Sequence, residues 1–108
     1  MFDSVLLCSD LSAVSEQLLA CISELKSIGT RKVVLLHVIY VANTPGLDDR
    51  LRVEAKPELA RQKKFLEDQG FEVIVETLLG LPRQVIADTA DKYHASFVLL
   101  GTHGKGGE

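Results

Sequence analysis

Residues 4–12 read SVLLCSDLS, a short apolar run that gives way to polar side chains. The apolar part, Ser4–Cys8, lacks the alternation of a half-exposed strand, which is typical of a strand buried on both faces of a sheet. The hydroxyls and the carboxylate of residues 9–12 suit a helix start, because their oxygens can accept hydrogen bonds from the first free backbone N–H groups. This stretch therefore predicts a buried strand that leads directly into a helix.

The same strand-to-helix pattern repeats along the chain. Apolar or alternating runs predict strands, and apolar residues at three- and four-residue spacing predict helices. In the middle of the chain, Pro57 either begins a new helix or kinks one long helix. The expected strands are Ser4–Cys8, Lys32–Val41, Phe71–Leu79 and Ser96–Leu100, and the expected helices run from Val14 to Gly29, from Leu47 to Gly70 and from Pro82 to Tyr93.

In two of these helices, the spacing of the residues defines one helical face. Leu59, Lys63 and Leu66 continue one helical stripe towards Gly70, where a glycine suits the residue after a helix. In the last helix, the residues expected to point inward are Val85, Ile86, Thr89, Ala90 and Tyr93.

The order β-α-β-α-β-α-β predicts an α/β fold, an open parallel sheet with helices on both faces. Right-handed crossovers narrow the possible strand orders. Ligands of such sheets bind beyond the carboxyl ends of the strands, where the strand order reverses. If the order is 3-2-1-4, strands one and four are neighbours, and Asp10 and Gly101 would face each other across that crevice.

Composition excludes several classes of function. The chain has 108 residues, which predicts one domain, and a formal charge of −3, which disfavours nucleic acid as a partner. It has neither a signal-peptide pattern nor an apolar run long enough for a membrane span. Cys8 and Cys21 match no zinc or redox motif and are expected to be buried, reduced thiols. We therefore expect a cytoplasmic protein that is not bound to a membrane.

The strongest local signal is GTHGKGG, residues 101–107. Glycines let successive backbone N–H groups surround an anion, and Lys105 adds positive charge. The alternative is a flexible tail. The segment is not a Walker A loop, because Gly107 stands where that motif needs lysine, and it does not follow the first strand as a dinucleotide fingerprint would.

The remaining polar candidates are fewer. Asp10 could contact a ligand or cap the following helix. His37 is expected to be a hydrogen-bonded core histidine, His94 to face solvent, and His103 to lie near the glycine-rich segment. The sequence offers no cluster at metal-ligand spacing and no nucleophile elbow.

Several of these segments together resemble the universal stress protein family over essentially the whole chain. The resemblance rests on strand one running into Ser9–Ser12, on Leu36-His37-Val38, on Gly80-Leu81-Pro82 and on Leu99–Gly106. It implies a five-stranded sheet of order 3-2-1-4-5, a homodimer, and ATP as ligand, accompanied by Mg or Mn in some members. It places Asp10 and Val38 against adenine and Gly101 and Gly104 against ribose and phosphates. Thr102, His103, Lys105 and Gly106 complete the expected nucleotide-binding set.

The sequence departs from the family where it stops at Glu108. The second half of the family's phosphate loop, its last helix and its fifth strand are missing, so we expect residues 1–108 to be one domain that is incomplete at the C-terminus. The predicted function is adenine-nucleotide (ATP or AMP) binding in a stress-response or regulatory protein, with slow ATP hydrolysis at most. The alternative is a dimeric protein-interaction module of the same family that binds no nucleotide. An adenylate-forming enzyme would need a glycine-containing loop after the first strand, which residues 9–12 lack.

Overall fold

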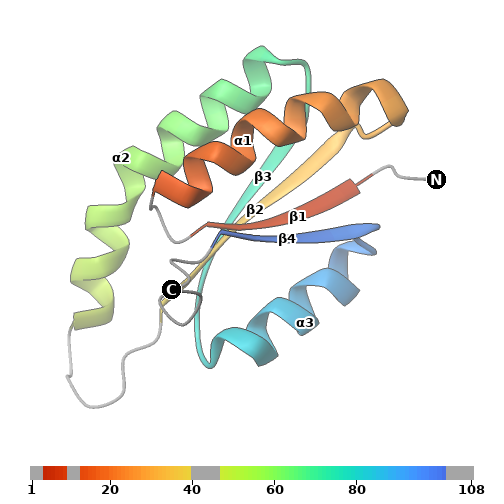
Figure 1. The fold of residues 1–108 in the computed structure, drawn as a ribbon. Coiled ribbons are helices and arrows are strands. Elements are labelled where there is room, and N and C mark those ends of the chain that lie inside the picture. The colour runs from red at the N-terminus through yellow and green to blue at the C-terminus, as the bar shows by residue number, and fades with distance from the viewer. Residues whose placement is uncertain (1–3, 10–12, 40–46, 102–108) are drawn as a thin grey trace.

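A computed structural model describes residues 4–9, 13–39 and 47–101 (Figure 1). The predicted alternation of strands and helices is confirmed, and most described boundaries lie within two residues of those expected. The first α-helix ends at Leu25, earlier than expected, and a 3₁₀ turn continues it to Ile28. Tyr40 and Val41, the expected end of the second strand, lie outside the described residues. The elements are β1 (Ser4–Ser9), α1 (Ala13–Leu25), the 3₁₀ turn η1 (Lys26–Ile28), β2 (Lys32–Ile39), α2 (Leu47–Asp68), β3 (Glu72–Leu79), α3 (Pro82–Tyr93) and β4 (Phe97–Gly101).

The four strands form one parallel sheet of order β3-β2-β1-β4, as predicted. Leu6 of β1 lies opposite Val34 of β2 on one side and Val98 of β4 on the other. β1 is therefore an inner strand, and its carboxyl end lies beside that of β4. Its last residue, Ser9, pairs in register with Gly101.

Helices cover the two faces of the sheet unequally. Figure 1 shows α1 and α2 on one face and α3 alone on the other. The face under α1 and α2 carries the larger apolar cluster, and that under α3 the smaller. All five residues predicted to point inward from α3 are confirmed: Thr89 is buried, and the other four pack against the smaller cluster. The larger cluster comprises Val5, Leu7, Leu19, Ile22, Val33, Leu35, Ala55, Leu59, Leu66, Phe71 and Val73, and the smaller is centred on Leu6, Val34 and Leu36.

The first helical region ends at Gly29, as the sequence predicts. Its φ of 104° lies in the left-handed region, which an L side chain rarely adopts, and its N–H donates to the carbonyl of Lys26 at 3.2 Å. This turn directs the chain from η1 back to the start of β2.

The region around Pro57 is one continuous helix, α2, which decides between the two alternatives left by the sequence. Its buried stripe differs from the predicted one. Gln62 is fully buried, whereas Lys63 is partly exposed and forms an ion pair with Glu67 at 2.8 Å. The predicted helical face of residues 59, 63 and 66 is therefore buried at Leu59 and Leu66 but not at Lys63. The spacing 55-59-62-66 follows the 3.6-residue period, so the buried face passes through position 62.

A polar cluster ties α3 to the neighbouring sheet. Tyr93 Oη donates a hydrogen bond to Glu76 of β3, and Lys92 Nζ lies 3.1 Å from the same Glu76 oxygen. The Tyr93 hydrogen bond lowers the pKa of Glu76, against an opposing effect of burial and with a further contribution from Lys92. The same bond raises the pKa of Tyr93, because ionisation would remove the donor and set two negative charges together.

We expect Tyr93→Phe to lower the free energy of unfolding at pH 7 by about 1 kcal/mol, because a hydrogen bond to a charged acceptor is lost. Because Glu76 has a lowered pKa in the folded state, its contribution is present above its ordinary pKa of 4.5 and disappears as pH falls through the lowered value. The difference between the two proteins in urea denaturation should therefore shrink below that value.

A Glu76→Gln background provides the control, since it removes the titrating group. In that background the effect of Tyr93→Phe should not change with pH. An equally pH-independent loss in the wild-type background would assign the role of Tyr93 to packing alone.

Candidate functional site

A cavity of about 530 Å³ opens at the carboxyl ends of β1, β2 and β4, beside the first turns of α3. Its volume lies within the range of small-molecule sites, and its walls are mostly apolar, as such sites usually are. The residues that line it are Cys8, Ser9, His37, Val38, Pro82, Arg83, Ile86, Ala87 and Leu100.

Some of the predicted site residues lie at or next to this cavity. The others lie outside the described residues. Val38 lines the cavity, and Gly101 directly follows the lining residue Leu100. Asp10 and residues Thr102, His103, Gly104, Lys105 and Gly106 lie outside the described residues. Gly101 pairs in register with Ser9, the residue before Asp10, so the strand ends that carry the two predicted halves of the site are neighbours.

A hydrogen-bonded pair fixes the end of β1 beneath the cavity. Ser9 Oγ donates to Gln62 Oε1 of α2 at 3.1 Å, and both residues are buried. Ser9 therefore belongs to β1. The other residues of the predicted capping stretch, 10–12, lie outside the described residues. The Ser9 carbonyl oxygen lies 2.8 Å from Nδ1 of His37 on β2. The prediction of a hydrogen-bonded His37 is confirmed. The residue is also one of those that line the cavity.

Sequence reasoning missed two of the residues that shape this region. Gln62 had a usable signal, since it occupies an apolar position in the periodic stripe of α2. Arg83 directly follows Pro82, the first residue of α3. Among the described residues that line the cavity, Arg83 is the only Lys or Arg. Nothing in the local sequence predicts that α3 brings this arginine to the ends of other strands.

Neither cysteine forms a disulfide in the structure, but their predicted burial is wrong. Cys21 is exposed on α1, and Cys8 is half-buried at the cavity. Cys8 lies on the face of β1 that only α3 covers, which leaves it less enclosed than Leu7, on the opposite face.

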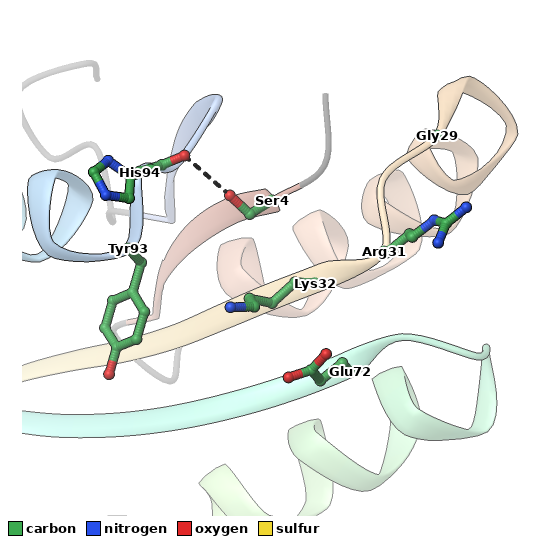
Figure 2. Close-up of a pocket in the computed structure, with 7 residues that line it drawn as sticks. All are labelled: Ser4, Gly29, Arg31, Lys32, Glu72, Tyr93 and His94. Carbon is green, nitrogen blue, oxygen red and sulfur yellow. Dashed lines mark hydrogen bonds between the residues drawn. The ribbon is translucent and has the colours of Figure 1, made fainter. Parts of the chain in front are cut away.

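A second hollow, of about 660 Å³, lies at the opposite ends of the strands (Figure 2). Figure 2 shows its cations pointing apart, with Lys32 turned towards Tyr93 and Arg31 directed away from both. Lys32 Nζ is 6.0 Å from the centre of the Tyr93 ring. His94 is exposed, as predicted, and its carbonyl accepts a hydrogen bond from Ser4 Oγ at 3.2 Å. Because the charged groups do not converge, we place the candidate site at the first cavity.

The described residues were also compared with the requirements of a metal site and of a membrane span. Over residues 4–9, 13–39 and 47–101, no group of three His, Cys, Asp or Glu side chains is arranged to hold a metal ion. Within the same residues, no helix has both the length and the apolar character needed to cross a bilayer.

The sequence profile of the Universal stress protein family matches residues 1–108. The chain belongs to this family. Universal stress protein MJ0577 of Methanocaldococcus jannaschii is 27% identical, over 97% of this chain and 79% of that protein. Universal stress protein MJ0531 of the same organism is 29% identical, over 70% of this chain and 50% of that protein.

Solved structures of universal stress proteins share the fold. The structure of MJ0577 superposes with a TM-score of 0.88 at 30% identity, covering 100% of this chain and 80% of the other. A family member from Burkholderia pseudomallei gives a TM-score of 0.81 at 21% identity, over 94% and 83% of the two chains. A universal stress protein in complex with cAMP gives 0.70 at 14% identity, over 90% and 70%, and so supports the fold alone.

We expect Gln62→Leu to lower the free energy of unfolding by about 1–3 kcal/mol, because it removes an acceptor from the Ser9 hydroxyl in a site that water does not reach. Ser9→Ala should then cost less in the Gln62→Leu background than in the wild type, since the two residues are coupled. Urea denaturation of the four proteins measures both effects. Gln84→Leu, the same change at an exposed glutamine of α3, should alter stability by less than about 0.5 kcal/mol. Additive effects of the Ser9 and Gln62 substitutions would show that the bond does not anchor β1.

Proposed function

We propose that this universal stress protein binds an adenine nucleotide, ATP or AMP, in the cavity at the carboxyl ends of β1, β2 and β4. The observation that carries the proposal is the position of that cavity. β2 pairs with one edge of β1 and β4 pairs with the other edge. The strand order therefore reverses between β1 and β4. Open parallel sheets bind their ligands at this reversal, outside the carboxyl ends of the strands.

The walls of the cavity suit a flat base with a charged tail. Val38, Ile86 and Leu100 supply apolar surface from three different elements. Arg83 brings a positive charge to the same cavity, in the first turn of α3, where the partial positive charge of a helix also favours phosphate. An apolar compartment with a cation at one side is complementary to a nucleotide rather than to a free sugar or a free anion.

The residues beyond the described range would complete the site. In this proposal Asp10 accepts a hydrogen bond from the base, while Gly101, Gly104 and the neighbouring residues 102, 103, 105 and 106 surround the ribose and phosphates. Mg or Mn would accompany the phosphates of ATP. A distant member that shares the fold has been solved in complex with cAMP, which is itself a nucleotide.

We assign the nucleotide a regulatory role in a cytoplasmic stress response. In this proposal, nucleotide binding acts as a signal by changing the surface formed by α3 and β4. The alternative function, a protein-interaction module without nucleotide, is favoured by a different observation. Val98 and Leu100 of β4 are 42% and 51% exposed, unusual for apolar residues of a sheet.

The nucleotide proposal predicts saturable binding of ATP, ADP or AMP in calorimetry at micromolar to millimolar concentrations. Ala87→Phe should weaken that binding at least tenfold, because Ala87 lines the cavity from an exposed position on α3 and a ring there would fill it. Ala60→Phe, at an exposed position of α2 outside the cavity, should bind as the wild type does. No heat of binding with any of the three nucleotides at millimolar concentration would reject the proposal.

Asp10→Asn tests the part of the site outside the described range. The amide keeps an oxygen that can cap a helix but loses the charge. We expect it to keep the melting temperature and to reduce the preference for ATP over GTP. An unchanged preference would leave Asp10 as a helix cap.

We also propose a homodimer that uses β4. In the described sheet β4 pairs only with β1, and an unpaired strand edge beside exposed apolar side chains is a template for a second copy. Val98→Lys should shift the protein towards monomer in light scattering, while Val53→Lys, at an exposed apolar residue of α2, should not. A wild-type protein that is monomeric at high concentration would exclude this dimer.

A further inference from the structure

We propose that Arg52 closes the β3 edge of the sheet against a second copy of this chain, so that self-association takes place at β4. The basis is a hydrogen bond from a side chain of α2 to the backbone of the edge strand. Arg52 Nη1 donates to the carbonyl oxygen of Thr77 at 2.8 Å, in a partly buried position. The expectation of a closed dimer rests on the proposed assembly through β4.

The described sheet has two edges. Its order is β3-β2-β1-β4, so β3 and β4 each pair with one strand only. A strand edge presents unpaired N–H and C=O groups, to which another chain can add a strand. A chain with two open edges can add copies without end, whereas like edges that pair with each other close as a dimer. A closed assembly of this chain therefore needs one of its two edges to be blocked.

The direction of the Thr77 carbonyl decides what the Arg52 bond does. At both ends of β3, the N–H of an even-numbered residue donates to a carbonyl on the β2 side. These bonds are Glu72 to Arg31, at 2.8 Å, and Gly80 to Ile39, at 3.1 Å. In a parallel ladder, alternate residues of a strand bond to the same neighbour. The odd-numbered residues of β3, Thr77 among them, therefore direct their N–H and C=O groups to the open edge, where Arg52 takes an acceptor that a further strand would need.

The bond lies in the more open half of this edge. Val73, near the amino end of β3, is buried, whereas Leu79, at the carboxyl end, is 45% exposed. Thr77 lies two residues from Leu79. Charged side chains placed on an edge, and groups that cover it, are the means by which natural sheets prevent pairing there. In an antiparallel pair of β3 strands, the two Arg52 guanidinium ions would also meet at one interface and repel each other.

The β4 edge has the opposite character. Its five residues, FVLLG, include no charged side chain. Val98 and Leu100 are exposed apolar residues of this strand. The chemistry of the two edges therefore favours a second copy at β4 and excludes one at β3.

The test measures the size of the assembly by sedimentation velocity. Arg52→Met removes the guanidinium and keeps an apolar stem, so we expect species larger than a dimer, against a dimer for the wild type. Combining Arg52→Met with Val98→Lys should return these species to a dimer, because only the β3 edge is then open. Arg50→Met is the matched control, since Arg50 is exposed on the same helix and pairs with Glu54. It should remain a dimer.

A second variant separates strand pairing from apolar adhesion by the new methionine. Thr77→Pro removes an N–H that points to the open edge, so the bonds between β3 and β2 are kept. In the Arg52→Met background it should restore the dimer. Larger species that persist with Thr77→Pro would assign the association to adhesion and overturn the proposal.

Hydrogen exchange gives a readout that needs no variant. In the wild type the outward amides of Val75, Thr77 and Leu79 should exchange faster than those of Glu76 and Leu78, which bond to β2. In the Arg52→Met assembly the outward amides should slow by about tenfold or more, because a strand then covers them. Slow exchange at all five amides in the wild type would show that β3 is already paired and would contradict a closed edge.

The outcomes separate this inference from the proposed assembly through β4. An Arg52→Met protein that stays a dimer overturns the role of Arg52 and leaves the β4 dimer intact. A monomeric wild type whose Arg52→Met variant dimerises removes the β4 dimer and keeps the role of Arg52.

Discussion

The pairing of β1 with two neighbouring strands is the constraint on which the rest of the structure depends. β1 bonds to β2 along one edge and to β4 along the other, and helices cover both of its faces. Val5, Leu6 and Leu7 are completely buried as a result. A strand held in this way cannot shift along its axis without exposing that run or breaking two ladders. The position of its carboxyl end, and hence of the cavity, follows from this.

The end of β1 is also the point where apolar packing gives way to polar contacts. Gln62 of α2 holds the side chain of Ser9 from one side of the sheet, and His37 of β2 holds its backbone carbonyl. A buried polar group is costly unless it has a partner, so each of these bonds favours one arrangement of α2, β1 and β2 over its alternatives. Gln62 does not line the cavity, yet it helps to fix the position of Ser9, which does.

Unequal helical cover explains why the cavity lies where it does. Two helices pack on one face of the sheet and bury the larger apolar cluster. On the other face, α3 packs over β1, β2 and β3, while Val98 and Leu100 of β4 stay exposed. The Tyr93, Glu76 and Lys92 cluster holds the carboxyl end of α3 against β3. Its amino end, with Arg83, therefore lies beside the ends of the central strands and completes the cavity.

The sequence by itself determined the order of elements, the parallel sheet and the inward face of α3, because periodicity and strand-helix alternation are local properties of the chain. The strand order 3-2-1-4 was implied by the resemblance to the universal stress protein family. Val38 and Gly101 lie near the carboxyl ends of β2 and β4, and the predicted binding roles of these two residues and of residues 10 and 102–106 stay predictions. Only the tertiary structure decided that Gln62 rather than Lys63 is buried, that Ser9 bonds to α2, that Cys8 and Cys21 are not enclosed, and that Arg83 shares a cavity with His37. Each of these depends on which elements come together over long separations in sequence, and a contact between residues 9 and 62 leaves no periodic trace in either segment.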